Sequence, residues 1–206
     1  MRALKNPLGL GAVALAVLLS AIIWLVLSGR ADSFDFPLRD TLLGLDPAGG
    51  ASLWSAITFL GSTALLTGLT ILCLTVFALR REWQPARHLA LVMGGAILAN
   101  NGLKWIIHRP RPLEVFQHTM PASFSFPSGH SLFSLAFYLS VAIIIAPRLS
   151  RMAGTMLFCM AILLILLIGA SRIFLGVHYP LDVMGGYTTA ALWLVVVRLF
   201  ERRRAR

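Results

Sequence analysis

Three short polar clusters interrupt an otherwise apolar chain of 206 residues, and their residue types could bind and attack a phosphate group. The first cluster runs over residues 104–112, the second over 127–130 and the third over 171–182. Together they contain cations, imidazoles, a carboxylate and a hydroxyl. Ionisable groups are costly at membrane depth, so their presence in such a chain indicates a functional site.

The second cluster has the sequence of a helix start. Ser128 after Pro127 is a good N-cap, which would make Gly129 and His130 the first helical residues. The amides at such a start lack intrahelical partners and carry positive potential, so they form a ready anion site. His130 is then placed to give a proton to a leaving oxygen. For this one string alone, an ordinary capped helix with an interfacial histidine is the simpler interpretation.

The third cluster pairs a histidine with a carboxylate. A helix is expected to begin at Pro180, because the residue before a proline avoids helical geometry. Asp182 in its first turn can reach back to His178 and fix the ring tautomer. The other ring nitrogen of His178 would then be free as a nucleophile. A purely structural hydrogen bond between the two side chains is the alternative.

Three cations accompany these groups: Lys104, Arg111 and Arg172. Guanidinium groups match phosphoryl oxygens, and lysine supplies a point charge. Snorkelling to the membrane surface is the simpler interpretation for other outer cations, namely Arg30, Arg39 and Arg109. The carboxylates expected near the site are Asp182 and Glu114, which are too few for a magnesium or zinc centre, so we predict no metal and no other cofactor.

The composition predicts an all-α, polytopic membrane protein. Its hydrophobic fraction is 58% and its charged fraction 13%, against about 45–50% and 25% in soluble domains. We expect one membrane-embedded domain over residues 1–206. Its six predicted spans are 8–28, 53–79, 88–107, 129–146, 152–171 and 181–200. The first run could be a signal peptide, but its length favours a retained anchor.

The charges predict the orientation in the membrane. The net charge of +10 could indicate nucleic-acid binding, but the excess lies on one side of the predicted spans. With both termini cytoplasmic, the inner segments hold twelve cations against Glu82 and Glu201, as the positive-inside rule expects. Those cations are Arg2, Lys5, Arg80, Arg81, Arg87, Arg148, Arg151, Arg198, Arg202, Arg203, Arg204 and Arg206. All three polar clusters then fall at extracytoplasmic helix mouths. The outer loop 29–52 could lie along the membrane surface or be a plain linker.

The three strings together resemble the signature of the type 2 phosphatidic acid phosphatase superfamily. The signature reads K-x6-R-P, P-S-G-H and S-R-x5-H-x3-D, and every position of it is present in order between residues 104 and 182. The resemblance implies that His178 is the nucleophile, oriented by Asp182, and that His130 is the general acid. It also implies a phosphate-binding set made of Lys104, Arg111, Ser128, Gly129 and Arg172.

The resemblance implies an integral lipid phosphatase of a cell membrane. It would act through a phosphohistidine on undecaprenyl diphosphate, phosphatidylglycerophosphate or phosphatidic acid, with the lipid bilayer and its substrate as partners. Two alternatives remain: a lipid A phosphatase or phosphotransferase, and a transporter or non-catalytic bundle with ion-paired polar groups. A surplus of cations argues against the second, because ion-paired bundles balance their charges. Soluble haloperoxidases share the signature, but six apolar spans argue against that class.

Overall fold

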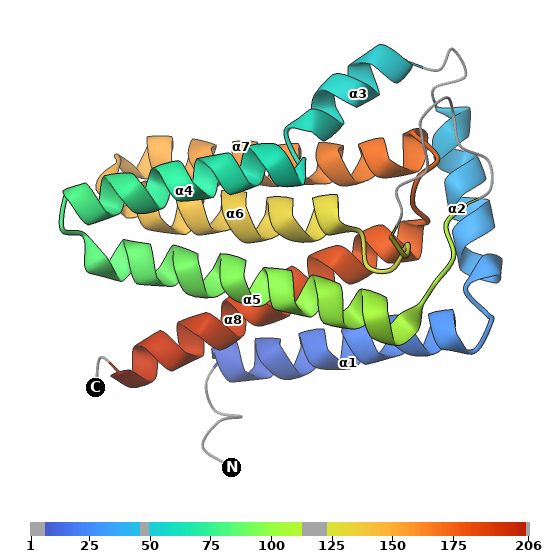
Figure 1. Ribbon diagram of the computed structural model, residues 1–206, viewed down its shortest axis with the longest axis horizontal. Coiled ribbons are helices and arrows are strands. Elements are labelled where there is room, and N and C mark those ends of the chain that lie inside the picture. The colour runs from blue at the N-terminus through green and yellow to red at the C-terminus, as the bar shows by residue number, and fades with distance from the viewer. Residues whose placement is uncertain (1–6, 46–49, 113–122, 205–206) are drawn as a thin grey trace.

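The computed structural model describes residues 7–45, 50–112 and 123–204, and all regular elements among them are helices (Figure 1). Six helical stretches are long and apolar enough to cross a membrane. This confirms the all-α, polytopic class. The elements are α1 (Pro7–Leu27), α2 (Asp32–Gly44), α3 (Ala51–Phe59), α4 (Thr63–Leu79), α5 (Trp83–Ile107), α6 (Gly129–Ile145), the short 3₁₀ helix η2 (Ala146–Arg148), α7 (Arg151–Phe174) and α8 (Pro180–Arg204).

The predicted span 53–79 is one candidate span by length, but it is not one uninterrupted helix. α3 ends at Phe59, and α4 restarts after Ser62, whose side chain accepts the Leu65 amide at 3.3 Å. Gly61 lies at the break. A Cβ there would stand 2.4 Å from the Ile168 side chain and 3.4 Å from the His130 ring. Glycine therefore lets the break pack against α7 and α6.

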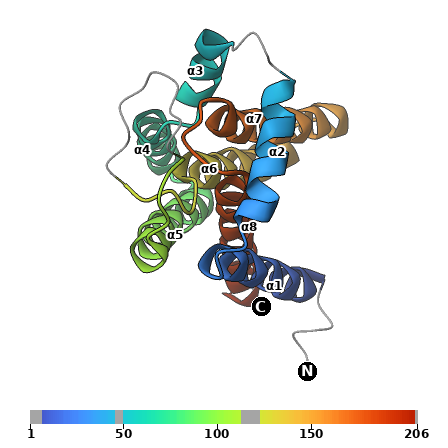
Figure 2. The same cartoon turned by 90° about the vertical axis from the view of Figure 1, so that its right-hand side faces the viewer.

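Residues 29–52, for which the sequence allows either a surface segment or a plain linker, contain a helix. α2 lies across the end of the bundle rather than along it, as the end-on view shows (Figures 1 and 2). Its Asp35 and Arg39 are buried, whereas Phe34 and Phe36 on the same helix are exposed. α2 thus covers the end of the bundle with polar groups turned inward.

α6 lies at the centre of the bundle and packs against α5, α7 and α8. Its Leu132 and Ala136 are fully buried in a core that also includes Leu89 and Val92 of α5. Many outer faces stay apolar and exposed, as lipid contact requires. Between helices that both prefer lipid, close packing and buried hydrogen bonds must supply the attraction. One example is the indole of Trp193, which fills the space beside Gly95 and donates to the Leu91 carbonyl at 3.0 Å.

Candidate active site

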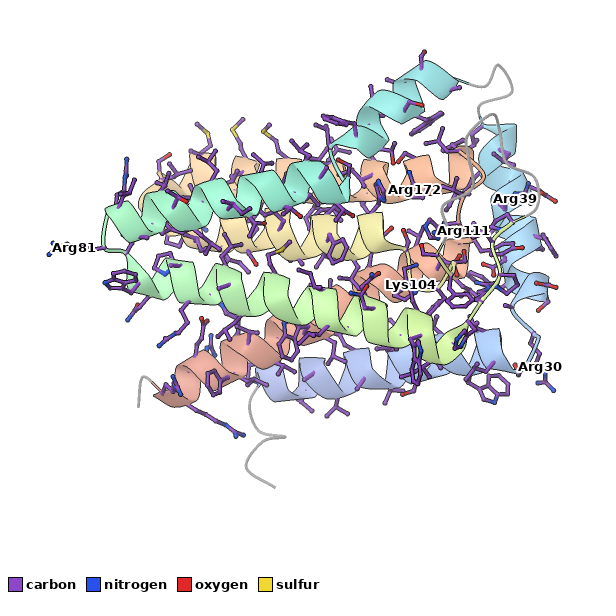
Figure 3. The ribbon with its side chains drawn as sticks, viewed as in Figure 1. Arg30, Arg39, Arg81, Lys104, Arg111 and Arg172 are labelled. Carbon is purple, nitrogen blue, oxygen red and sulfur yellow. The ribbon has the colours of Figure 1, made fainter. Side chains whose placement is uncertain are left out.

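The three polar clusters converge at one end of the bundle, the end that α2 covers. Lys104, Arg111 and Arg172 lie close to this end, and Arg81 marks the opposite one (Figure 3). The chain arrives there by the C-terminus of α5 and leaves it by the N-terminus of α6. It returns by the C-terminus of α7 and leaves again by the N-terminus of α8. The convergence predicted from loop charge is thus present in the fold.

His178 and Asp182 meet at the start of α8, but a serine bridges them. α8 begins at Pro180 as predicted. His178 Nδ1 is 3.5 Å from Asp182 Oδ2, at the limit of a hydrogen bond, and 3.3 Å from Ser125 Oγ. Ser125 Oγ in turn donates to Asp182 Oδ2 at 2.5 Å. These distances fit a His178 Nδ1–H that donates to Ser125 Oγ, which in turn donates to Asp182. The expected direct hydrogen bond between His178 and Asp182 is thus largely replaced by two hydrogen bonds through Ser125.

Both carboxylate oxygens of Asp182 accept hydrogen bonds, and one donor is Arg109, for which the sequence suggests a position at the membrane surface. Its Oδ2 also accepts the Tyr179 amide at 2.9 Å, which is the reach-back expected of an acid in the first helical turn. Its Oδ1 accepts Arg109 at 2.8 Å. The interpretation of Arg109 as a snorkelling side chain is therefore wrong. The left-handed conformation of His108, with φ 50°, ends α5 and turns the chain so that Arg109 enters the site.

A second carboxylate, which the sequence did not suggest, completes this ion-pair group. Asp35 of α2 is fully buried, and its Oδ2 accepts the other terminal nitrogen of Arg109 at 2.5 Å. Burial disfavours the Arg109 cation, but Asp182 and Asp35 outweigh it and raise the pKa of Arg109. The snorkelling interpretation also fails for Arg39, because that side chain is buried on the same helix.

The second ring nitrogen of His178 faces an arginine. Arg111 NH1 lies 3.1 Å from Nε2 and donates to the Val177 carbonyl at 2.8 Å, while its Nε donates to the Ser123 carbonyl at 2.8 Å. Burial lowers the pKa of His178 to about 4. The hydrogen bond and the charge of Asp182 oppose this effect, and Arg111 and Arg172 add to it. His178 is thus a neutral imidazole near pH 7, as a nitrogen nucleophile must be.

The other two cations are held by groups outside the three motifs. Arg172 NH1 donates to Thr58 Oγ1 of α3 at 2.6 Å, and its buried Nε has no hydrogen-bond partner among the described residues. Lys104 donates to the Phe124 carbonyl. Arg172 is close enough to Arg111 for their charges to repel, and so is Lys104. Cations held this near to one another in a buried site favour an anion between them.

The start of α6 adds backbone donors to this group. Ser128 caps the helix, with its Oγ accepting from Ser131 N at 3.4 Å and from Ser131 Oγ at 3.0 Å. The first intrahelical bond runs from Leu132 N to Ser128 O, so the amides of Gly129 and His130 precede it. A Cβ at Gly186 would lie 2.7 Å from the Ser128 carbonyl, which explains how α8 approaches this turn so closely.

His130 belongs to the same group. The cationic side chains of Arg172 and Arg111 lie near enough for their charges to act on its ring. The predicted site residues therefore come together, and the charge count needs one correction. Near the motif residues, the described part of the chain holds Lys104, Arg109, Arg111 and Arg172 against Asp35 and Asp182, and Arg39 is buried on α2 at the same end. Cations therefore outnumber carboxylates among the described residues here, while Glu114 lies outside them.

The comparisons with known proteins agree with this geometry. The family model of the PAP2 superfamily matches residues 85–206, which is more than half of the chain. The chain belongs to the PAP2 superfamily. It is a polytopic membrane lipid phosphatase of that superfamily, and hence a phosphoric ester hydrolase, so the predicted family and enzyme class are confirmed.

One curated relative and two solved structures are similar to this chain over most of their length. Phosphatidylglycerophosphatase B of Bacillus subtilis (strain 168) is 33% identical over 152 residues, 72% of this chain and 74% of the relative. The crystal structure of a transmembrane PAP2-type phosphatidylglycerolphosphate phosphatase from B. subtilis has a TM-score of 0.82 and 26% identity, with 93% and 96% of the chains covered. LpxE of Aquifex aeolicus, with a TM-score of 0.60, 24% identity and coverage of 81% and 95%, shows a shared fold.

Sequence reasoning missed four residues of this PAP2 site: Asp35, Thr58, Arg109 and Ser125. Asp35 and Thr58 precede the matched range 85–206, and they reach the site only because α2 and α3 pack over the helix mouths. Arg109 and Ser125 lie within the matched range but outside the three motif strings. The sequence itself shows only that Arg109 precedes Pro110, and its burial is visible only in the fold.

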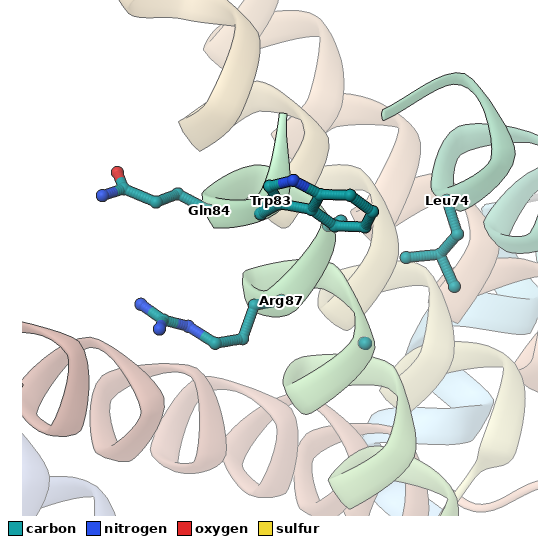
Figure 4. Close-up of a pocket in the computed structure, with 6 residues that line it drawn as sticks. Leu74, Trp83, Gln84 and Arg87 are labelled. Carbon is teal, nitrogen blue, oxygen red and sulfur yellow. The ribbon is translucent and has the colours of Figure 1, made fainter. Parts of the chain in front are cut away.

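One hollow among the described residues lies far from this site. It forms at the opposite end, between α4 and the start of α5, where Leu74, Trp83, Gln84 and Arg87 line it (Figure 4). Its lining holds a single charged side chain, Arg87, and no carboxylate or imidazole. This hollow therefore lacks the groups that the three polar clusters bring together at the other end.

Proposed function

We propose that the enzyme removes the terminal phosphate of a glycerophospholipid monoester, with phosphatidylglycerophosphate as the first candidate, at the outer face of a cell membrane. The observation that carries the proposal is the environment of His178. One ring nitrogen is tied to Ser125 and Asp182, and the other faces Arg111 inside a cation group. Similarity to a phosphatidylglycerophosphatase of B. subtilis, in sequence and in structure, supports this choice of substrate.

In the proposed first step, Nε2 of His178 attacks phosphorus and the bond to the lipid oxygen breaks. His130 gives its proton to that oxygen, so the lipid leaves as an alcohol. The phosphate replaces Nε2 as the acceptor of Arg111, and Asp182 with Ser125 stabilises the charge that develops on the ring. In the second step, water attacks phosphorus and the phosphorus–nitrogen bond breaks. His130 takes the proton of that water, and inorganic phosphate and neutral His178 are released.

Charge stabilisation is assigned to the side chains around the phosphate. Lys104, Arg111 and Arg172 would bind the equatorial oxygens, which carry most of the charge in phosphoryl transfer. The amide of Gly129 and the N-cap Ser128 at the start of α6 would supply further donors. No metal ion or other cofactor enters this mechanism. Residues 1–206 would work as one membrane-embedded domain, because α2 and α3 contact the residues of the motif helices.

Phosphate release by the purified protein tests the proposal. Phosphatidylglycerophosphate, phosphatidic acid, undecaprenyl diphosphate and lipid A would be compared in one detergent by kcat/KM. We expect phosphatidylglycerophosphate to be the best substrate, activity to persist in EDTA, and vanadate to inhibit because it can adopt the five-coordinate shape of phosphorus under attack. A clear preference for undecaprenyl diphosphate or lipid A would replace the proposed substrate. Loss of activity in EDTA, restored by magnesium or zinc, would overturn the mechanism.

The outward orientation needs a separate experiment. We expect both termini in the cytoplasm because the basic inner segments oppose translocation. Asp40 on α2 and Arg81 between α4 and α5 are both exposed and lie at opposite ends of the bundle. In a background lacking Cys73 and Cys159, an impermeant thiol reagent added to intact cells should label Asp40→Cys and spare Arg81→Cys. The reverse pattern would place the site in the cytoplasm.

A further inference from the structure

We infer that Asp35 of α2 is a positioning residue for Asp182 and acts on it through Arg109. The inference rests on the proposed function, in which Asp182 with Ser125 orients the nucleophile His178. It adds a residue that lies outside the three motifs and outside the range that the family model matches. α2 would then be part of the catalytic apparatus and not only a cover for the end of the bundle.

The first support is the bonding of Asp35. Its Oδ2 accepts from Arg109 NH2 at 2.5 Å, and its Oδ1 accepts the backbone amide of Leu181 at 2.8 Å. Leu181 immediately precedes Asp182 at the start of α8. Asp35 therefore holds Asp182 in two ways: through the backbone of the neighbouring residue and through the arginine bound to the Asp182 side chain.

The second support is the geometry of Arg109. The planar guanidinium presents two terminal nitrogens at a fixed angle, and each one donates to a different carboxylate, NH1 to Asp182 and NH2 to Asp35. The plane also lies over the ring of Tyr179, 4.3 Å from its centroid. With Arg109 on Oδ1, the Oδ2 of Asp182 is directed to Ser125 and His178. The orientation of Asp182 therefore depends on Arg109, whose own orientation Asp35 fixes.

The third support is burial. Asp35 and Asp182 are fully buried and Arg109 is 7% exposed, so water cannot take over the role of any one of them. Burial raises the pKa of Asp35, and Arg109 opposes that rise. Asp35 is shielded from water on a helix that covers the end of the bundle, and its charge acts through Arg109 on Asp182. This arrangement indicates a role beyond attachment of the helix.

A double-mutant cycle tests the inference. Asp35→Asn keeps the shape and the acceptor for Leu181 but removes the charge that orients Arg109. We expect kcat to fall about 10- to 100-fold, as for a misplaced catalytic group, with KM within about twofold, because Asp35 does not touch substrate. In an Asp182→Asn background the same change should lower kcat less than about threefold, because residues that act in one chain are not additive.

Two further variants serve as a negative control and as an independent test of the role of Arg109. Asp40→Asn on the exposed face of α2 is the matched control and should leave kcat unchanged. Arg109→Lys keeps the positive charge but not the fork to two carboxylates, so it should reproduce the kcat loss. All variants are compared per folded molecule, with the unfolding temperature measured alongside.

The outcomes separate this inference from the proposed function. If Asp182→Asn lowers kcat but Asp35→Asn does not, the inference is overturned and the mechanism stands. Equal kcat losses from Asp35→Asn in both backgrounds would also overturn it, because an independent structural role predicts additivity. If Asp182→Asn itself leaves kcat unchanged, the proposed role of Asp182 fails and the inference fails with it.

Discussion

Two histidine–carboxylate pairs, each with a buried histidine, lie at opposite ends of the bundle, and both carboxylates come from α8. At the end with the three polar clusters, His178 Nδ1 is 3.5 Å from Asp182 Oδ2. At the basic end His88 Nδ1 of α5 is 3.1 Å from both carboxylate oxygens of Glu201. The shorter and more symmetric pair is thus the one far from the polar clusters. A histidine next to an acid does not by itself identify a catalytic centre.

The surroundings of each pair explain the difference. Asp182 is held by Arg109, Ser125 and a backbone amide, and the free ring nitrogen of His178 faces Arg111. The free Nε2 of His88 is buried and has no hydrogen-bond partner among the described residues, while Arg198 lies 3.6 Å from Glu201. One pair turns its second ring nitrogen toward cations, and the other joins α5 to α8. The difference teaches that anion-binding groups around the free nitrogen, more than the pair itself, indicate function.

The largest expected effect comes from replacing each of the two histidines, one at a time, by glutamine. His178→Gln should lower kcat by more than about 1000-fold, because glutamine cannot form the phosphoenzyme and covalent catalysis is lost. His88→Gln should leave kcat per folded molecule within about twofold. It should instead lower the free energy of unfolding by about 1–3 kcal/mol, because Glu201 loses a buried partner. Phosphate release and detergent-solubilised unfolding, measured on both variants, check this contrast.

Residual activity of His178→Gln within about tenfold of the parent would contradict the assignment of the nucleophile. A large kcat loss in His88→Gln without a loss of folded protein would contradict the distinction between the two pairs. Substrate labelled with ³²P should leave label on the parent protein and none on His178→Gln. A loss of stability alone would not produce this difference.

The next effect concerns the arginines near each pair. Arg172→Ala should lower kcat/KM about 100-fold, because a charged donor aimed at the transferring phosphoryl group contributes a few kcal/mol. Arg198→Ala, beside Glu201, should leave kcat/KM unchanged. The steady-state kinetics of both variants on the best lipid substrate give the comparison. Equal losses in the two would show that the arginines act through overall charge and not through contact with the phosphate.

The fold was predictable because lipid imposes a simple requirement on sequence. Long apolar runs placed six spans, and the basic segments between them distinguished the two ends of the bundle. The break at Gly61 and the helix over Asp32–Gly44 were not predicted. Both depend on contacts with residues far along the chain: Gly61 packs against Ile168, and Asp35 binds Arg109. Hydropathy contains no information of this kind.

The motif part of the site was predictable because helix starts and polar residues at membrane depth are local signals. Ser128 caps α6 and Pro180 begins α8, as their sequences indicate. The supporting residues were not predictable, since Thr58, Ser125 and Asp35 are ordinary side chains until the fold brings them to Arg172, His178 and Arg109. Their roles follow from distance, which one sequence does not provide.

A smaller effect should appear in the pH dependence of stability. The folded pKa of His178 is about 4, chiefly because of burial, and lies below the ordinary value of 6.5. Between these values the unfolded chain binds a proton that the folded chain does not, so acidification favours unfolding. The contribution is up to about 1.4 kcal/mol per pH unit. The free energy of unfolding should therefore fall more steeply from pH 6.5 to 5 in the parent than in His178→Gln. Parallel slopes would contradict a neutral, buried His178.

The smallest expected effect tests whether α3 contributes to the phosphate site. Thr58 Oγ1 accepts from Arg172 NH1 at 2.6 Å, and Thr58→Val removes that acceptor with little change in volume. Arg172 keeps its charge but loses one fixed contact, so we expect KM to rise about three- to tenfold with a modest fall in kcat, in keeping with about 1 kcal/mol for one hydrogen bond. Thr155→Val on α7 is the matched control, because its hydroxyl donates only to the Arg151 carbonyl of its own helix at 2.9 Å. In an Arg172→Ala background Thr58→Val should have no further effect on KM. A KM change that persists there would mean that Thr58 acts on the substrate by another route, and that the short bond to Arg172 does not position the guanidinium.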